Sequence, residues 1–269
     1  MMAAMSTAVK TSAVHISNEM VVFLRNAFGL LFLSPALIRV GPRLLQTRRF
    51  TEHLGRSLFG LAAMYCFFYA IAHMPLAEAV LLNFSSPVFT AIFATLWLKE
   101  PLTRYLLGGI LIGLVGVVLI LKPGPGLWSS AAPVGVISAV CAGLAMTHIR
   151  SMADTEPTLR IVLYFAIIGT LTSALPLTWA WQTPPTAALL SMAAAGLFAS
   201  MGQVALTYSY SQLPAAQVGA MSYTTVIFAA LFGWLLWRET PDLMAAGGAA
   251  LIVSAGVLAS TRSPLEELD

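Results

Sequence analysis

PLAEAVLLNFSSPVFTAIFATLWLKEP occupies residues 75–101, and no charged side chain lies between Glu78 and Lys99. A second segment at residues 214–240, PAAQVGAMSYTTVIFAALFGWLLWRET, aligns with it at an offset of 139, which takes Pro75 to Pro214. The same offset pairs Tyr69 with Tyr208, Phe89 with Phe228, Phe93 with Phe232, Glu100 with Glu239, Gly108 with Gly247 and Gly109 with Gly248. Such self-similarity indicates a duplicated unit, and each apolar run is long enough to cross a membrane as a helix.

The composition of the whole chain agrees with a membrane protein. Of its 269 residues 58% are hydrophobic and only 9% are charged, whereas soluble domains carry about 25% charged residues. A water-soluble fold is therefore excluded. Helices are expected because the period-two alternation of barrel strands is missing, and only helices and closed barrels satisfy their backbone groups in lipid. The basic residues lie at the ends of the apolar runs, which does not favour nucleic acid as a partner.

Hydropathy predicts nine complete spans, near residues 20–40, 56–73, 76–98, 104–121, 133–149, 160–181, 186–208, 214–237 and 242–260. An additional apolar stretch, residues 1–9, would give only about 14 Å of helix before Lys10. It lacks the basic start and cleavage pattern of a signal peptide. Because the second copy begins with the span at 133–149, we interpret residues 1–10 as the end of its counterpart, and expect about ten residues of that first helix to be absent.

The predicted fold is an all-α integral membrane protein, a ten-helix bundle of 5+5 helices in inverted repeats with a truncated first helix. The first repeat is expected at 1–122, a linker at 123–132 and the second repeat at 133–262. An odd number of spans per repeat inverts the second copy. With both termini in the cytoplasm, the inner side of the membrane carries most of the basic residues, as the positive-inside rule requires. Those residues are Arg39, Arg43, Arg48, Arg49, Arg56, Lys99, Arg104, Arg150, Arg160 and Arg262.

The paired segments also carry a resemblance to a known family. The motifs are Pro75-Leu-Ala-Glu-Ala, Asn83-Phe-Ser-Ser-Pro87, Leu98-Lys-Glu-Pro101, Leu213-Pro-Ala-Ala-Gln217, Trp237-Arg-Glu239, Phe23-Leu-Arg25-Asn26 and Gly108-Gly109. In their order and duplication the sequence resembles the drug/metabolite transporter superfamily, in its EamA-domain branch. The resemblance implies ten helices around a central cavity that opens alternately to each side, with a solute that is commonly exported. It implies no particular substrate.

The motifs of other functional classes are missing from the sequence. It has no HExxH, no GxSxG and no GxxxxGK[ST] loop, so neither an enzyme nor ATP-driven transport is expected. No cofactor or metal is expected, and Cys66 and Cys141 are interpreted as small buried hydrophobes. We expect a secondary transporter in the inner membrane, an exporter of small metabolites such as amino acids or related polar or amphipathic solutes. A non-transporting scaffold or a channel-like protein is the alternative, and monomer and homodimer both stay open.

Polar residues inside spans are the candidate solute contacts, because a charged side chain facing lipid costs about 2.5–3.5 kcal/mol. Gln203 is the foremost candidate, and Gln217 and Thr224 lie on one face of the next span. Arg25 could neutralise an anionic solute, pair with a carboxylate such as Glu19, or reach the membrane surface. Asn83 and Ser86 share a helix face with Thr90. This stripe fits a cavity wall or hydrogen bonds between helices.

Aromatic and titratable residues complete the set of candidates. Tyr65 and Tyr69 lie one helical turn apart, as in an aromatic wall, and Tyr223 falls in the matching region of the other half. Glu78, just after Pro75, either caps its helix or carries a proton that couples transport. His148 is interpreted either as a solvated histidine near a helix end or as part of a proton relay.

Overall fold

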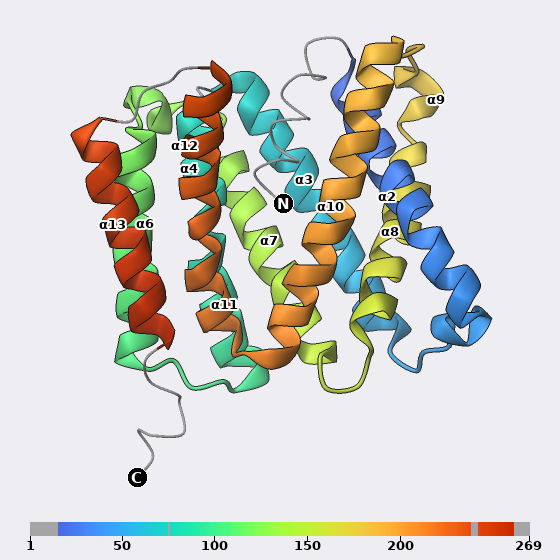
Figure 1. Ribbon diagram of the computed structural model, residues 1–269, viewed down its shortest axis with the longest axis horizontal. Coiled ribbons are helices and arrows are strands. Elements are labelled where there is room, and N and C mark those ends of the chain that lie inside the picture. The colour runs from blue at the N-terminus through green and yellow to red at the C-terminus, as the bar shows by residue number, and fades with distance from the viewer. Residues whose placement is uncertain (1–15, 75, 238–241, 261–269) are drawn as a thin grey trace. The chain divides into compact units, whose positions relative to one another are not determined.

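The computed structural model describes residues 16–74, 76–237 and 242–260, and within these ranges it contains helices and no strand. The predicted stretch at residues 1–10 lies outside them. The helices are α2 (Asn18–Val40), η1 (Pro42–Leu45), α3 (Phe50–His73), α4 (Leu76–Asn83), α5 (Ser86–Phe93), η2 (Ala94–Leu98), α6 (Arg104–Leu121), η3 (Pro125–Trp128), α7 (Ala132–Met152), α8 (Thr158–Ala174), α9 (Leu177–Ala180), α10 (Thr186–Gln212), α11 (Ala215–Ser222), α12 (Thr224–Trp237) and α13 (Leu243–Ser260). Figure 1 shows their course.

Each of the nine predicted spans has a helical counterpart. Within the described residues, eight stretches have the length and apolar composition to cross a membrane, and α8 is a shorter apolar helix. The sequence predicts a span over residues 160–181, but α8 ends at Ala174 and only the single turn of α9 follows. Pro176 explains the difference, because proline lacks the N–H that a continuing helix would need.

The chain divides into two compact units that each draw on both predicted repeats. Unit 1 combines the described residues up to Leu61 with His148–Ser211, and unit 2 combines Ala62–Thr147 with the described residues from Gln212 onward. Helices α3 and α7 each contribute one end to unit 1 and the other to unit 2. Unit 1 thus holds α2, α8, α9 and nearly all of α10, while unit 2 holds α4, α5, α6, α11, α12 and α13.

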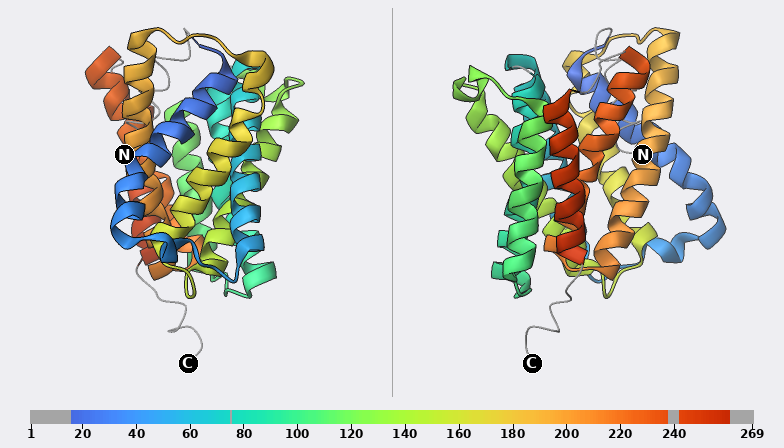
Figure 2. Two further views of the ribbon diagram at one scale, coloured as in Figure 1. Left: turned by 90° about the vertical axis from the view of Figure 1, so that its right-hand side faces the viewer. Right: turned by 60° about the vertical axis from the view of Figure 1, so that its left-hand side comes forward.

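In unit 2 the most extensive packing joins α6 to α13, which run side by side (Figure 2). A Cβ added to Gly248 would lie 2.6 Å from the Gly116 carbonyl oxygen, and one added to Gly109 would lie 3.1 Å from that of Ala255. These two contacts run in opposite order along the helices, so α6 and α13 are antiparallel. The offset of 139 takes Gly109 to Gly248 and Gly116 to Ala255, so each contact is the repeat image of the other.

Two membrane-length segments of unit 2 are interrupted at equivalent positions. The first breaks between α4 and α5, where Ser85 donates from Oγ to the Leu82 carbonyl oxygen at 2.5 Å and Pro87 begins the new turn. The second breaks at Tyr223, between α11 and α12. The repeat offset takes Phe84 to Tyr223, and their ring centroids lie 6.4 Å apart. The two breaks are therefore neighbours within this unit.

In unit 1, α2 packs against α8 and α10 through small residues. A Cβ added to Gly196 of α10 would lie 2.5 Å from the Phe28 Cβ, so α10 comes close to α2 only because this residue is glycine. Ser200, one turn further along α10, donates from Oγ to the Gly29 carbonyl oxygen at 3.1 Å. This close approach fixes the two helices that hold the site described below.

The contact between α6 and α13 offers a matched pair of substitutions on one helix. Gly248→Ala should lower stability by about 1–3 kcal/mol, because its methyl group would clash with the Gly116 carbonyl. Gly247→Ala, with no described atom within 4 Å of the new Cβ, should be neutral or stabilise by up to about 1 kcal/mol through helix propensity. Thermal unfolding of the purified variants in detergent measures both, and equal melting temperatures would contradict the close packing.

Candidate functional site

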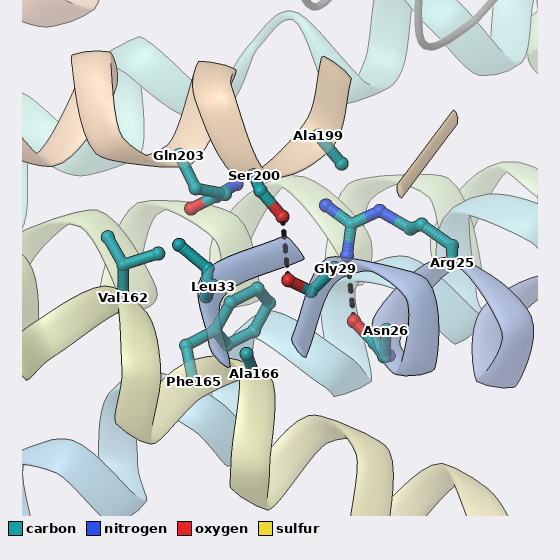
Figure 3. A pocket seen from close by; sticks show the side chains of 10 residues that line it. All are labelled: Arg25, Asn26, Gly29, Leu33, Val162, Phe165, Ala166, Ala199, Ser200 and Gln203. Atoms are coloured by element: carbon teal, nitrogen blue, oxygen red, sulfur yellow. Dashed lines mark hydrogen bonds between the residues drawn. The ribbon is translucent and has the colours of Figure 1, made fainter. Parts of the chain in front are cut away.

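A small cavity lies in unit 1 between α2, α8 and α10 (Figure 3). Its volume of about 20 Å³ holds about one water molecule. Two of the residues predicted from sequence, Arg25 and Gln203, line it together. The complete lining consists of Arg25, Asn26, Gly29, Leu33, Val162, Phe165, Ala166, Ala199, Ser200 and Gln203. The cavity therefore combines an apolar wall with a few convergent polar groups.

Arg25 brings a positive charge to this cavity. It lies about 10 Å along α2 from the first residue of the helix, and its side chain is buried, 7% exposed. One guanidinium nitrogen, Nη1, donates to the Asn26 Oδ1 atom at 2.9 Å. The Asn26 Nδ2 donor is itself buried and has no acceptor among the described residues. The Arg25–Asn26 pair therefore keeps a buried N–H donor, Asn26 Nδ2, for which no acceptor is described.

Arg56 supplies a second buried cation, which the sequence interpretation placed among the cytoplasmic flanking residues. Because α3 begins at Phe50, Arg56 lies about 9 Å inside the helix and is only 2% exposed. Its Nη2 donates to the Gln203 Oε1 atom at 2.9 Å. Gly60, one turn further on, leaves the space into which the guanidinium group folds. The Arg56 Nε donor is buried and has no acceptor among the described residues.

Phe165 of α8 connects the two arginines. Its ring centroid lies 4.1 Å from the Arg56 Cζ atom and 6.0 Å from the Arg25 Cζ atom. Cation–π contacts of this kind contribute about 0.5–2 kcal/mol each. Phe165 was not among the predicted residues, since a phenylalanine in an apolar span gives no signal that separates it from packing.

Neither arginine is paired with an acid in the described part of the chain. The ion pairs found there involve neither Arg25 nor Arg56, and Glu19, considered from the sequence as a partner of Arg25, does not bond it. Removing an unpaired charge from water costs several kcal/mol. Two buried arginines without a described acidic partner therefore lie against one ring in unit 1.

A separate polar cluster joins the first turns of α3 to the end of α7. His148 is 8% exposed, and its Nδ1 lies 2.7 Å from the Glu52 Oε2 atom. The same carboxylate oxygen accepts from the Ser151 hydroxyl at 3.1 Å. The Phe59 ring stacks on His148 with centroids 5.7 Å apart. The structure thus gives His148 a partner that the sequence did not suggest.

Glu156 forms the centre of a neighbouring cluster in the loop before α8. It is 7% exposed and accepts hydrogen bonds from Thr47 Oγ1 and Arg160 Nη1, both at 2.6 Å. His53 Nε2 lies 3.7 Å from its Oε2 atom. Burial raises the pKa of the Glu156 carboxyl, but the hydrogen bonds from Thr47 and Arg160 and the charge of Arg160 outweigh it, so the pKa lies below its ordinary value.

The predicted residues of unit 2 are arranged differently. Asn83 Nδ2 donates to the Ser138 hydroxyl at 3.1 Å, and Ser138 donates to the Ala63 carbonyl oxygen at 2.9 Å, so Asn83 takes part in hydrogen bonds between helices. The Glu78 Oε1 atom accepts from the Gly124 N–H at 2.7 Å. Its Oε2 atom is buried without a described partner, as is the Tyr223 hydroxyl.

The remaining predicted residues of unit 2 are spread over four helices. Ser86 begins α5, Tyr65 and Tyr69 lie on α3, Gln217 on α11 and Thr224 on α12. Tyr69 stacks on His73 with ring centroids 4.0 Å apart. Among the described residues of this unit, no hydrogen bond joins Tyr69, Gln217 or Thr224 to another predicted site residue. Unit 2 therefore shows no cluster of these side chains comparable to the one in unit 1.

A family model matches almost the whole chain in two copies. The EamA-like transporter family aligns with residues 1–122 and again with residues 129–261. The chain belongs to the EamA-like transporter family. This EamA-like protein is therefore a multi-pass membrane protein of a transporter family, as the resemblance of its paired segments predicted.

Relatives of the EamA-like chain carry different solutes. The pseudopaline exporter of Pseudomonas aeruginosa is 35% identical over 95% of this chain and 90% of its own. A riboflavin transporter of Brucella anthropi is 26% identical over 90% of this chain and 87% of its own. A crystal structure of another protein has a TM-score of 0.83, with 20% identity over 96% of this chain and 92% of that one, which shows a shared fold.

The low pKa of Glu156 gives a prediction with a defined pH dependence. Because its pKa is lower in the folded protein, ionised Glu156 stabilises the fold above the unfolded value of about 4.3, and that stabilisation is lost as the pH falls through the folded pKa. Glu156→Gln should therefore lower the melting temperature at pH 7, and the difference from wild type should shrink below about pH 4. Asp154→Asn, at an 83% exposed side chain, is the control. A pH-independent difference would contradict the ionic role.

Proposed function

We propose that the protein is a secondary transporter that exports small metabolites, such as amino acids or related polar or amphipathic solutes, across the inner membrane. The observation that carries this proposal is the buried cavity of unit 1, where Arg25, Asn26 and Gln203 converge inside apolar helices. Intramembrane ionisable groups are costly and commonly mark a solute pathway. Membership of a transporter family and the name of the pseudopaline exporter among its relatives support transport and its direction.

The proposed mechanism is alternating access by a ten-helix bundle of two inverted repeats, with both termini in the cytoplasm. The antiparallel pairing of α6 with α13 supports the inversion, because these helices are equivalent in the two repeats. The equivalent breaks at Ser85 and Tyr223 support it as well, since interrupted helices in both halves are typical of such transporters. The repeats are proposed to span 1–122 and 133–262.

Solute contacts are proposed in both units. In unit 1 they are Arg25 and Gln203, which already share one cavity. In unit 2 the candidates are Asn83, Ser86, Tyr65, Tyr69, Gln217, Tyr223 and Thr224. Of these, Tyr223 is supported by its buried hydroxyl without a described partner and by its place at a helix break.

Proton coupling is proposed at Glu78. Its side chain is 3% exposed, and its Oε2 atom has no described hydrogen-bond partner, so the carboxyl could hold a proton there. The bond from the Gly124 N–H to Oε1 also fits the alternative interpretation, in which Glu78 only anchors the loop after α6. The pair of His148 and Glu52 is a second position where a proton could be held.

Reconstituted proteoliposomes test transport against the alternatives. Purified protein should give saturable counterflow of at least one radiolabelled solute from a panel of amino acids, nucleobases and riboflavin. A channel would give flux that rises linearly with solute concentration. A scaffold would give none, so either result from folded protein would overturn the proposal.

Glu78→Gln separates coupling from anchoring. Glutamine keeps an oxygen that can accept from the Gly124 N–H but cannot carry a proton at neutral pH. If Glu78 couples transport, the variant should lose the stimulation of flux by a pH gradient and retain counterflow, which moves no net proton. Glu19→Gln is the control. If a pH gradient stimulates flux in Glu78→Gln as fully as in wild type, Glu78 does not carry the coupling proton and only anchors the loop after α6.

A further inference from the structure

One lining residue of the unit 1 cavity, Asn26, and one residue bonded to its lining, Arg56, have buried polar atoms without described partners, and both atoms are hydrogen-bond donors. The Asn26 Nδ2 and Arg56 Nε atoms are buried and have no acceptor among the described residues. The two side-chain amide oxygens of the site are already used, because Asn26 Oδ1 accepts from Arg25 and Gln203 Oε1 accepts from Arg56. A bound group that contributes acceptors would therefore satisfy the two donors left without described partners.

The positive charge of the site favours the same kind of ligand as its unsatisfied donors do, namely an anion with acceptor oxygens. Arg25 and Arg56 are both more than nine-tenths buried and both lie against the Phe165 ring. No described carboxylate pairs with either arginine, so no described negative charge offsets the two positive charges. One water in the cavity could satisfy a donor but would leave the charge unchanged.

We infer that an oxyanion head group of the transported solute, a carboxylate or a phosphate, binds at this cavity. Arg25 lines the cavity, and Arg56 lies beside it, in contact with the lining residues Gln203 and Phe165. The inference rests on the proposed transport function and names the solute class. Guanidinium groups match such oxyanions with paired N–H donors. Asn26 Nδ2 is the additional donor, and Phe165 holds both cations in place.

The size and walls of the cavity limit what enters it. With a volume of about 20 Å³ the cavity holds about one water molecule, so the side chains that line it must move apart for a carboxylate or phosphate group to enter. Leu33, Val162 and Ala166 form apolar walls that lower the local dielectric, so the attraction between a guanidinium and an anion is stronger there than in water. A cationic solute would meet two like charges at this point.

The competing interpretation gives both arginines a structural role. In it, Arg25 and Arg56 only connect α2, α3, α8 and α10 through Asn26, Gln203 and Phe165. That role requires no ligand and gives no selectivity for charge. The two interpretations differ in how the wild-type protein responds to acids and to their neutral analogues.

The first experiment therefore uses the purified full chain in lipid-free detergent. Its melting temperature is measured with succinate, glutamate, glycerol 3-phosphate, the neutral analogues succinamide and glutamine, and the cation choline. We expect at least one acid to raise the melting temperature by several degrees, while its neutral analogue and choline do not. Comparison of glycerol 3-phosphate with the carboxylates separates the two oxyanions, and anionic phospholipid in a parallel sample separates a lipid head group from a soluble solute.

Substitutions assign the effect to the two arginines. Arg25→Gln and Arg56→Gln should each weaken binding of the stabilising acid by about thirtyfold or more. Arg39→Gln, at an exposed position near the end of the same helix α2, is the matched control and should bind as wild type does. Should a glutamine variant fail to fold, Arg56→Lys keeps the charge but loses the paired donors, and it should weaken binding without abolishing it.

Several outcomes would overturn the inference. Stabilisation by neutral or cationic solutes alone, by anionic lipid alone, or by acids equally in wild type and folded Arg25→Gln and Arg56→Gln variants would each do so. Counterflow of a neutral solute with no competition from any acid would refute the anionic head group and leave the proposed transport intact. Absence of transport for every solute tested would count against the proposed function itself, so the two failures are distinguishable.

Discussion

A backbone N–H or C=O without a partner in hydrocarbon costs several kcal/mol, and this constraint forces nearly every apolar segment of the chain into a helix. Helices in lipid gain little from hydrophobic burial against one another, so contact between them depends on how closely their backbones approach. Gly248 against Gly116 in unit 2 and Gly196 against Phe28 in unit 1 are such approaches. In both contacts a glycine lets the facing helix come close, and in unit 1 this close approach lies beside the polar side chains of the cavity.

At the contact between α2 and α10, the residues that pack the helices together also line the polar cavity. Ser200 bonds the Gly29 carbonyl, and the same two residues line the cavity that Arg25 and Gln203 share. The contact that joins the helices thus also sets the distance across the site. A larger residue at Gly29 would approach the Ser200 hydroxyl, since a Cβ there would lie 3.1 Å from Oγ. A substitution at Gly29 or Ser200 would therefore change both the spacing of α2 and α10 and the lining of the cavity.

The sequence predicted the spans well because hydropathy and charged ends report directly on lipid exposure. The expected span at 104–121 coincides with α6. Arg25 and Gln203 were found as candidates because polar residues are conspicuous in apolar runs. Arg56 was missed because a basic residue beside the apolar run 57–72 normally marks a helix end, and only the start of α3 at Phe50 shows that it is internal.

Other features had no local signal in the sequence. Glu52 and His148 meet although 96 residues separate them, and no periodicity links a loop-proximal glutamate to a helix on another part of the chain. Phe165 looks like any apolar side chain of a span. The breaks at Ser85 and Tyr223 are also hard to predict, because Pro87 suggests the first while no proline accompanies the second.

The paired contacts Gly116–Gly248 and Gly109–Ala255 have a consequence for the origin of the chain. A single repeat that met a second copy of itself across a two-fold axis would make one such contact twice, in an isologous interface. In that homodimer a single substitution would change both of the symmetry-related contacts. Fusion of the two copies into one gene removes this restriction, and the two halves of the interface do differ: position 116 is glycine, whereas the equivalent position of the second repeat, 255, is alanine.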